Sequence, residues 1–93
     1  MPTPRRQALR IVVQYLGDPD RYRLIAYGDA AVYRPLEFAS RADILRALRH
    51  LVPGINKDAV PVHNKSVNSR IIFTADVDVS ESQLHEAGLS KQD

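Results

Sequence analysis

Residues 9–27, LRIVVQYLGDPDRYRLIAY, decide the fold because they hold two apolar runs separated by a turn. In both runs, every second side chain is apolar, so these side chains share one face, which is the pattern of a half-buried strand. Between the runs, Asp18 and Pro19 suit positions i and i+1 of a type I turn. The stretch therefore predicts an antiparallel hairpin in which Val12 faces Ile25.

A third strand is expected over 30–36, directly after the dipeptide Gly28-Asp29. Such a dipeptide is typical of a two-residue hairpin loop, in which glycine supplies the positive φ that a primed turn demands. A loop of that length fixes the register of the second hairpin. It predicts that Val32 lies opposite Ile25.

Two helices and a fourth strand are expected in the rest of the chain. Ser40 is a suitable N-cap for a helix over 41–51, whose apolar residues recur at helical spacing. The strand over 70–79 has the clearest alternation in the chain and is expected to pair beside the first strand. The capping-box pattern from Ser80 to Gln83 predicts the start of a short C-terminal helix.

The predicted fold class is α+β. It comprises a three-stranded antiparallel meander, a fourth strand, one long helix packed on one sheet face and a short C-terminal helix. The alternative is a β-grasp-like arrangement, in which two long strands precede the helix. We expect a single domain over 8–89, with disordered tails over 1–7 and 90–93.

The sheet face turned away from the long helix is the most informative predicted surface. Both hairpin registers bring apolar side chains into one row on this face, and the fourth strand adds another. One interpretation is that the C-terminal helix covers the row through Leu84 and Leu89. The other is that the row binds a partner, since an apolar band with a polar rim is typical of interaction sites. The candidate partner-binding residues are Val12, Ile25, Val32, Ile72, Arg23, Arg34 and Tyr27.

The charge of the chain argues against a dedicated nucleic-acid binder, because the net charge is only +2. Most of the arginines nevertheless fall in the N-terminal half, which suggests weak binding of nucleic acid or another anion. The stacking aromatic residues of single-strand binders are missing, because only Tyr27 is expected on the open face of the sheet. The candidate anion-binding residues are Arg5, Arg6, Arg10, Arg46 and Arg49.

No motif for catalysis, a metal or a cofactor emerges. The chain has no cysteine, which excludes disulfides and thiolate ligands, and its three histidines lie on separate predicted elements. The pair Asp76 and Asp78 lacks the further oxygen ligands that a hard cation requires. A polar loop over 63–70, with His63 and Arg70, is the only candidate for a small enzyme site, and it lacks an acid to orient the histidine. We therefore expect no catalytic residues, no bound metal and no cofactor.

The leading hypothesis is a small non-enzymatic protein-interaction module that uses the outer sheet face to bind a protein partner or to self-associate as a homodimer. The alternatives are weak nucleic-acid or anion binding by the arginine-rich half and, less favoured, an enzyme centred on the 63–70 loop. The N-terminal sequence lacks a secretory apolar core and no apolar run has the length of a membrane span. We expect a cytoplasmic protein without membrane contact.

Overall fold

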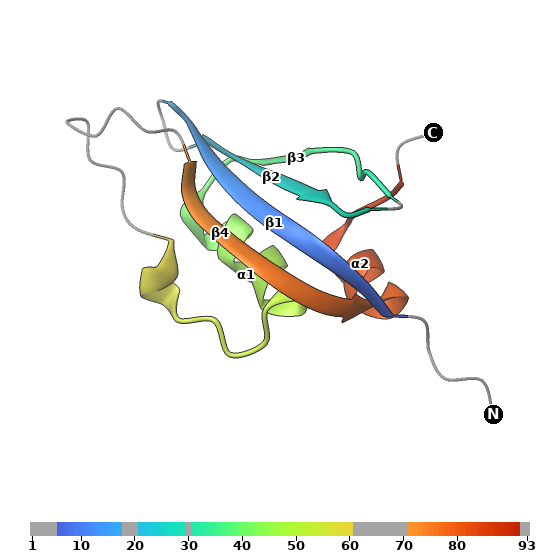
Figure 1. Ribbon diagram of the computed structural model, residues 1–93. Coiled ribbons are helices and arrows are strands. Elements are labelled where there is room, and N and C mark those ends of the chain that lie inside the picture. The colour runs from blue at the N-terminus through green and yellow to red at the C-terminus, as the bar shows by residue number, and fades with distance from the viewer. Residues whose placement is uncertain (1–5, 18–20, 30, 61–70, 92–93) are drawn as a thin grey trace.

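The computed structural model describes residues 6–17, 21–29, 31–60 and 71–91. It confirms an α+β fold with four antiparallel strands in one sheet and two helices. Figure 1 shows the sheet with both helices lying behind it. The elements in chain order are β1 (Arg6–Gly17), β2 (Arg21–Tyr27), β3 (Leu36–Phe38), α1 (Arg41–Leu51), a 3-10 turn η1 (Lys57–Ala59), β4 (Ile71–Ser80) and α2 (Glu81–Ala87).

The sheet has the strand order β3-β2-β1-β4, so β1 pairs with a neighbour on both sides. The first hairpin has the predicted register, with Val12 opposite Ile25 and Tyr15 opposite Tyr22. The two tyrosine rings meet edge to face, with centroids 5.6 Å apart. The predicted place of the fourth strand beside the first is also confirmed.

The predicted register of the second hairpin is wrong. Val32 forms an isolated bridge with Tyr27, not with Ile25, and β3 begins only at Leu36. Between these points the chain leaves β2, because the backbone N–H of Arg34 donates to the carbonyl of Ser90 at 2.9 Å. The following proline has no N–H to return to the ladder. The strand therefore resumes several residues later than the alternation suggested.

The expected role of Gly28 is wrong as well. Among the described residues, a positive φ occurs only at Gly17, Gly54 and Gly88. Gly28 is needed for space instead: a Cβ at this position would lie 2.7 Å from the carbonyl oxygen of Ala8.

Both helices begin with the caps that the sequence predicts. The side chain of Ser40 accepts from the backbone of Asp43 at the start of α1, and Ser80 and Gln83 form a complete capping box at α2. At the end of α2, Gly88 adopts the left-handed conformation, with φ 91°. The two helices pack against each other on the same side of the sheet, and Gln83 Nε2 donates to the carbonyl of His50 at 3.0 Å.

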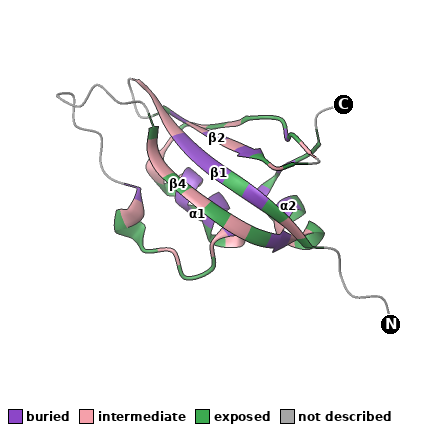
Figure 2. Ribbon diagram, in the orientation of Figure 1, coloured by how far each residue is buried: buried purple, intermediate pink, exposed green. Residues whose placement is uncertain are grey.

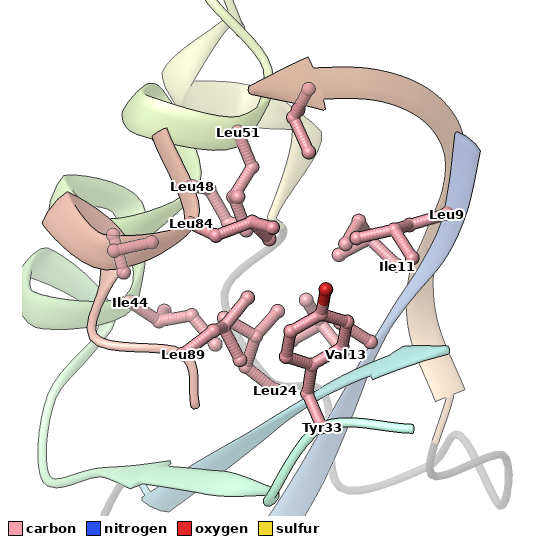
Figure 3. Close-up of a cluster of buried hydrophobic side chains, with 14 of the residues drawn as sticks. Leu9, Ile11, Val13, Leu24, Tyr33, Ile44, Leu48, Leu51, Leu84 and Leu89 are labelled. Carbon is pink, nitrogen blue, oxygen red and sulfur yellow. The ribbon is translucent and has the colours of Figure 1, made fainter. Parts of the chain in front are cut away.

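The core lies between the sheet and this pair of helices. Figure 3 shows leucines of α1 and α2 meeting apolar side chains of β1 and β2, with the Tyr33 ring among them. The Tyr33 hydroxyl donates to Gln7 Oε1 at 2.7 Å, and burial raises its pKa. Arg41 holds the segment after α1 by donating to the carbonyls of Val60 and Lys57. The fully buried large side chains are Ile11, Val13, Tyr22, Leu24, Ile44, Leu48, Leu51, Val60 and Val79.

The ordered sheet extends beyond the predicted domain limits. Arg6 and Gln7, expected in a disordered tail, are the first residues of β1 and pair with β4. At the other end, Lys91 forms a bridge with Tyr33. Among the described parts of the chain, no helix is both long and apolar enough to span a bilayer.

Candidate interaction surfaces

The outer face of the sheet, which is the face opposite both helices, carries alternate residues of the strands. On β1, Ile11 and Val13 belong to the core, whereas Val12 between them does not, although only 9% of it is exposed. Figure 2 shows buried and exposed positions succeeding each other along β1. The interpretation that the C-terminal helix covers this face is wrong, because Leu84 and Leu89 are buried in the core on the other side. No described element of the chain lies over the outer face.

Four of the candidate partner-binding residues lie together on this face, and we call them the outer-face stripe: Val12, Ile25, Tyr27 and Val32. They form two facing pairs on neighbouring strands, Val12 with Ile25 and Tyr27 with Val32. The second pair is the more accessible, with Tyr27 41% and Val32 54% exposed. The expected apolar grouping therefore exists, but its pairing differs from the predicted one.

The remaining three candidates, Ile72, Arg23 and Arg34, have other neighbours than the predicted ones. Thr74 lies opposite Val12, and a register shift between Val13 and Gln14 leaves Ile72 without a partner on β1. Ile72 packs against the core instead. Arg23 faces Glu37 and not Arg34, because the strand opposite is β3. The predicted register, with Val32 opposite Ile25, would have placed Arg34 opposite Arg23, and this like-charge pair does not form.

Ion pairs border the stripe on both sides. Near β3, Glu37 accepts from Arg21 at 2.6 Å and lies 3.8 Å from Arg23. Near β4, Arg10 binds Asp76 through two nitrogens, at 2.9 and 3.3 Å. The hydrogen bonds and charge of Arg10 lower the pKa of Asp76, and the same contacts raise the pKa of Arg10. The rim of the outer-face stripe therefore carries both signs of charge.

The candidate anion-binding arginines do not form one site. Arg6 and Arg10 lie on β1 and pair with carboxylates of β4, at 3.4 and 2.9 Å. Arg46 belongs to α1 and lies 3.5 Å from Asp43, while Arg49 is exposed on the same helix. Arg5 lies outside the described residues. Because most of these guanidinium groups already face a carboxylate, little positive charge is left to attract phosphates.

A shallow hollow of about 500 Å³ opens where β2 ends beside β1. Its lining includes Arg10, Tyr27, Asp29 and Asp76. No histidine lines it, and a carboxylate whose pKa is lowered is a poor general base. Within the described ranges, no group of three or more His, Cys, Asp or Glu side chains is placed to hold a metal ion. The loop over 63–70, the candidate enzyme site, lies outside the described residues.

The chain was also compared with known proteins, and neither family models, curated proteins nor solved structures gave a match. A functional argument must therefore start from the surfaces of this chain. The two that stand out are the uncovered outer face and the outermost long strand, β4.

Proposed function

We propose that the protein is a non-enzymatic interaction module that forms a homodimer by packing the outer faces of two sheets together. The observation that carries this proposal is the position of α2. Both helices lie on one side, so the other side of a four-stranded sheet has no covering element among the described residues. A sheet face that bears apolar side chains is stabilised by packing against another layer.

The outer-face stripe supplies the apolar centre of the proposed interface. Tyr27 and Val32 are two of the three exposed large hydrophobic residues that the described chain has. Tyrosine is enriched in interfaces because its ring buries a large area while its hydroxyl remains hydrogen-bonded. We expect Tyr27 to be the residue that contributes most to association.

The charges around the stripe favour a second copy as the partner. A two-fold axis brings each surface against an identical one, so a rim with a single sign of charge would repel itself. The rim here contains arginines and carboxylates side by side, as in the pairs Arg10–Asp76 and Arg23–Glu37. Rotation about the axis can place an arginine of one copy near a carboxylate of the other.

Sedimentation equilibrium of the wild type and of two variants tests the proposal. Val32→Asp places a charge in the stripe at a position more than half exposed, so the fold should be kept while the dimer dissociates. Ala42→Asp makes the same kind of change on the exposed side of α1 and should leave the dimer intact. A wild type that is monomeric at all concentrations, or a Val32→Asp variant that dimerises like the wild type, contradicts the proposal. The cytoplasmic location expected from the sequence stays a prediction.

A further inference from the structure

The side of β4 away from β1, with which no strand of the described residues pairs, is a second surface, distinct from the outer-face stripe; we call it the open side. β4 spans ten residues, Ile71–Ser80, and is the last strand of the sheet. Figure 1 shows it at the margin of the sheet, with β1 on one side. An edge strand presents a row of backbone N–H and C=O groups that can pair with another extended chain.

The hydrogen bonds of the second hairpin show which backbone groups face this edge. The N–H of Tyr33 donates to the carbonyl of Ala26 at 3.2 Å, so the backbone of Ala26 points away from β1. The backbone N–H and C=O groups of successive residues point to opposite edges of a strand, so those of Ile25 point toward β1. The backbone groups of its partner Val12 therefore point toward β2. Those of the neighbouring residue Ile11 point toward β4.

The same alternation continues across β4. Ala75 lies opposite Ile11, so its N–H and C=O belong to the ladder with β1. Thr74, Asp76 and Asp78 then direct their backbone groups to the open side. An independent contact agrees: the carbonyl of Asp78 accepts from Arg6 Nη2 at 2.6 Å, which fits a carbonyl outside the β1 ladder.

The pairing with β1 shows what kind of strand β4 accepts. On the outer face, Arg10 of β1 lies opposite Asp76 and binds it with two hydrogen bonds. On the inner face, apolar residues meet apolar residues, for example Ile11 opposite Ala75. β4 therefore pairs with a strand in which basic residues alternate with apolar ones.

The inner face of β4 has apolar area left for a further strand. Phe73, Ala75 and Val77 are only half-buried, whereas the residues beside them on β1 are almost entirely buried. An added strand would place its own apolar side chains next to this row and remove it from water. On the outer face, the same strand would meet the carboxylates of Asp76 and Asp78. These carboxylates pair with Arg10 and Arg6, but their side chains remain 72% and 65% exposed, so their free lone pairs can accept from a further cation.

We propose that the open edge of β4 binds an extended segment of a partner protein in which basic and apolar residues alternate. The segment adds as an antiparallel fifth strand, bonded to the outward backbone groups of Thr74 and Asp76 and to the N–H of Asp78, whose carbonyl already accepts from Arg6. Its basic side chains face the two carboxylates, and its apolar side chains cover the inner row. Pairing with β4 of a second copy is disfavoured, because antiparallel registers that overlap these positions bring carboxylates opposite or diagonal to one another.

Amide hydrogen exchange of the free full chain tests whether the edge is open. The amides of Thr74, Asp76 and Asp78 should exchange fast, and those of Phe73, Ala75 and Val77, which bond to β1, should exchange slowly. Protection of the three outward amides in the free protein would mean that the edge is already covered. That result would overturn the proposal.

A peptide titration followed by amide NMR shifts tests the chemistry of the occupant. The probe is a peptide with the sequence of residues 6–14, RQALRIVVQ, which has the required alternation. Binding should shift and protect the outward amides of β4, and replacing both arginines of the peptide by glutamate should weaken binding roughly tenfold. Equal binding of the two peptides, or shifts centred on β2 because the peptide displaces β1, would overturn the proposal.

Two proline variants test the geometry. Thr74→Pro removes an outward amide without removing a ladder bond, so the protein should stay folded and lose peptide binding. Ala75→Pro removes an amide bonded to β1 and should unfold the sheet. A folded Thr74→Pro variant that binds the peptide as tightly as the wild type would contradict the proposal. A wild-type dimer that Thr74→Pro dissociates, without any peptide binding, would assign the edge to a second copy and would also overturn it.

Discussion

The two faces of the sheet differ in what covers them, although the sequence makes both apolar near their centre. On the inner face, Ile11 and Val13 have no exposed surface, because two helices lie over them. On the outer face, Val12 is 9% exposed and Ile25 is half-buried although no described helix lies over them, while Tyr27 and Val32 are exposed. The inner face thus holds the core, whereas the outer face leaves Tyr27 and Val32 exposed, and on these residues the proposed association depends.

The largest expected effect comes from truncating the same residue type on each face. Ile11→Ala should lower the free energy of unfolding by about 2–5 kcal/mol, because it leaves a cavity beneath the helices. Ile25→Ala should lower it by about 1 kcal/mol, since Ile25 is only half-buried. Urea denaturation at low protein concentration measures both. Equal losses would contradict the difference between the faces.

A smaller loss of stability should follow from adding a methyl group at Gly28, where the backbone lies close to that of Ala8 in β1. In Gly28→Ala the new Cβ meets the backbone oxygen of Ala8 at 2.7 Å, and the loss should be about 1–3 kcal/mol. Gly54→Ala is the matched control, because nothing lies within 4 Å of its Cβ and only its positive φ, 82°, opposes the change. It should cost about 1 kcal/mol. If thermal unfolding shows a larger loss of stability for Gly54→Ala than for Gly28→Ala, the backbone of Ala8 must move easily away from the new methyl group.

The junction between the sheet and the helix layer on its inner face can be tested at Ser80, which ends β4 and caps α2. Ser80→Ala should lower the free energy of unfolding by about 1 kcal/mol, because the first turn of α2 loses a hydrogen-bond acceptor. Ser82→Ala, at an exposed position inside the same helix, should have almost no effect. Circular dichroism during urea unfolding measures both variants, and equal losses would argue against the capping box.

The smallest effect is expected for the charges on the outer face. Arg10 lowers the pKa of Asp76, so the carboxylate form stabilises the folded state above the pKa it has in the unfolded chain. This contribution is lost as the pH falls through the folded-state pKa. Asp76→Asn should therefore be slightly less stable than the wild type near neutral pH and equal to it in strong acid. A difference that persists in strong acid would show that the carboxylate charge is not responsible.

The sequence allowed the first hairpin to be predicted because two long alternating runs leave only one register with matching faces. The second hairpin could not be predicted in the same way. Its register depends on Arg34 bonding to Ser90, a residue far along the chain, and on the space that Gly28 leaves for Ala8. Neither requirement has a local signature in the sequence.

The composition of the candidate surface was predictable only in part. Alternation alone was enough to predict Val12, Ile25 and Tyr27 on the outer face. No sequence pattern indicates the register shift beside Ile72, which packs against the core. The side on which α2 packs was equally undetermined, since a short helix with two buried leucines can dock on either face. That the candidate residues on this surface bind a partner stays a prediction.

The burial of Tyr33 limits when the chain can complete its fold during synthesis. Tyr33 is 2% exposed, its hydroxyl is bonded to Gln7, and its backbone is bridged to Lys91, so one residue joins the beginning, the middle and the end of the described chain. Contacts over such long sequence separations are slow to form. During synthesis, the ribosome must release residue 91 before Tyr33 can be enclosed. Until then the apolar side of the first hairpin is open to chaperones and to neighbouring nascent chains.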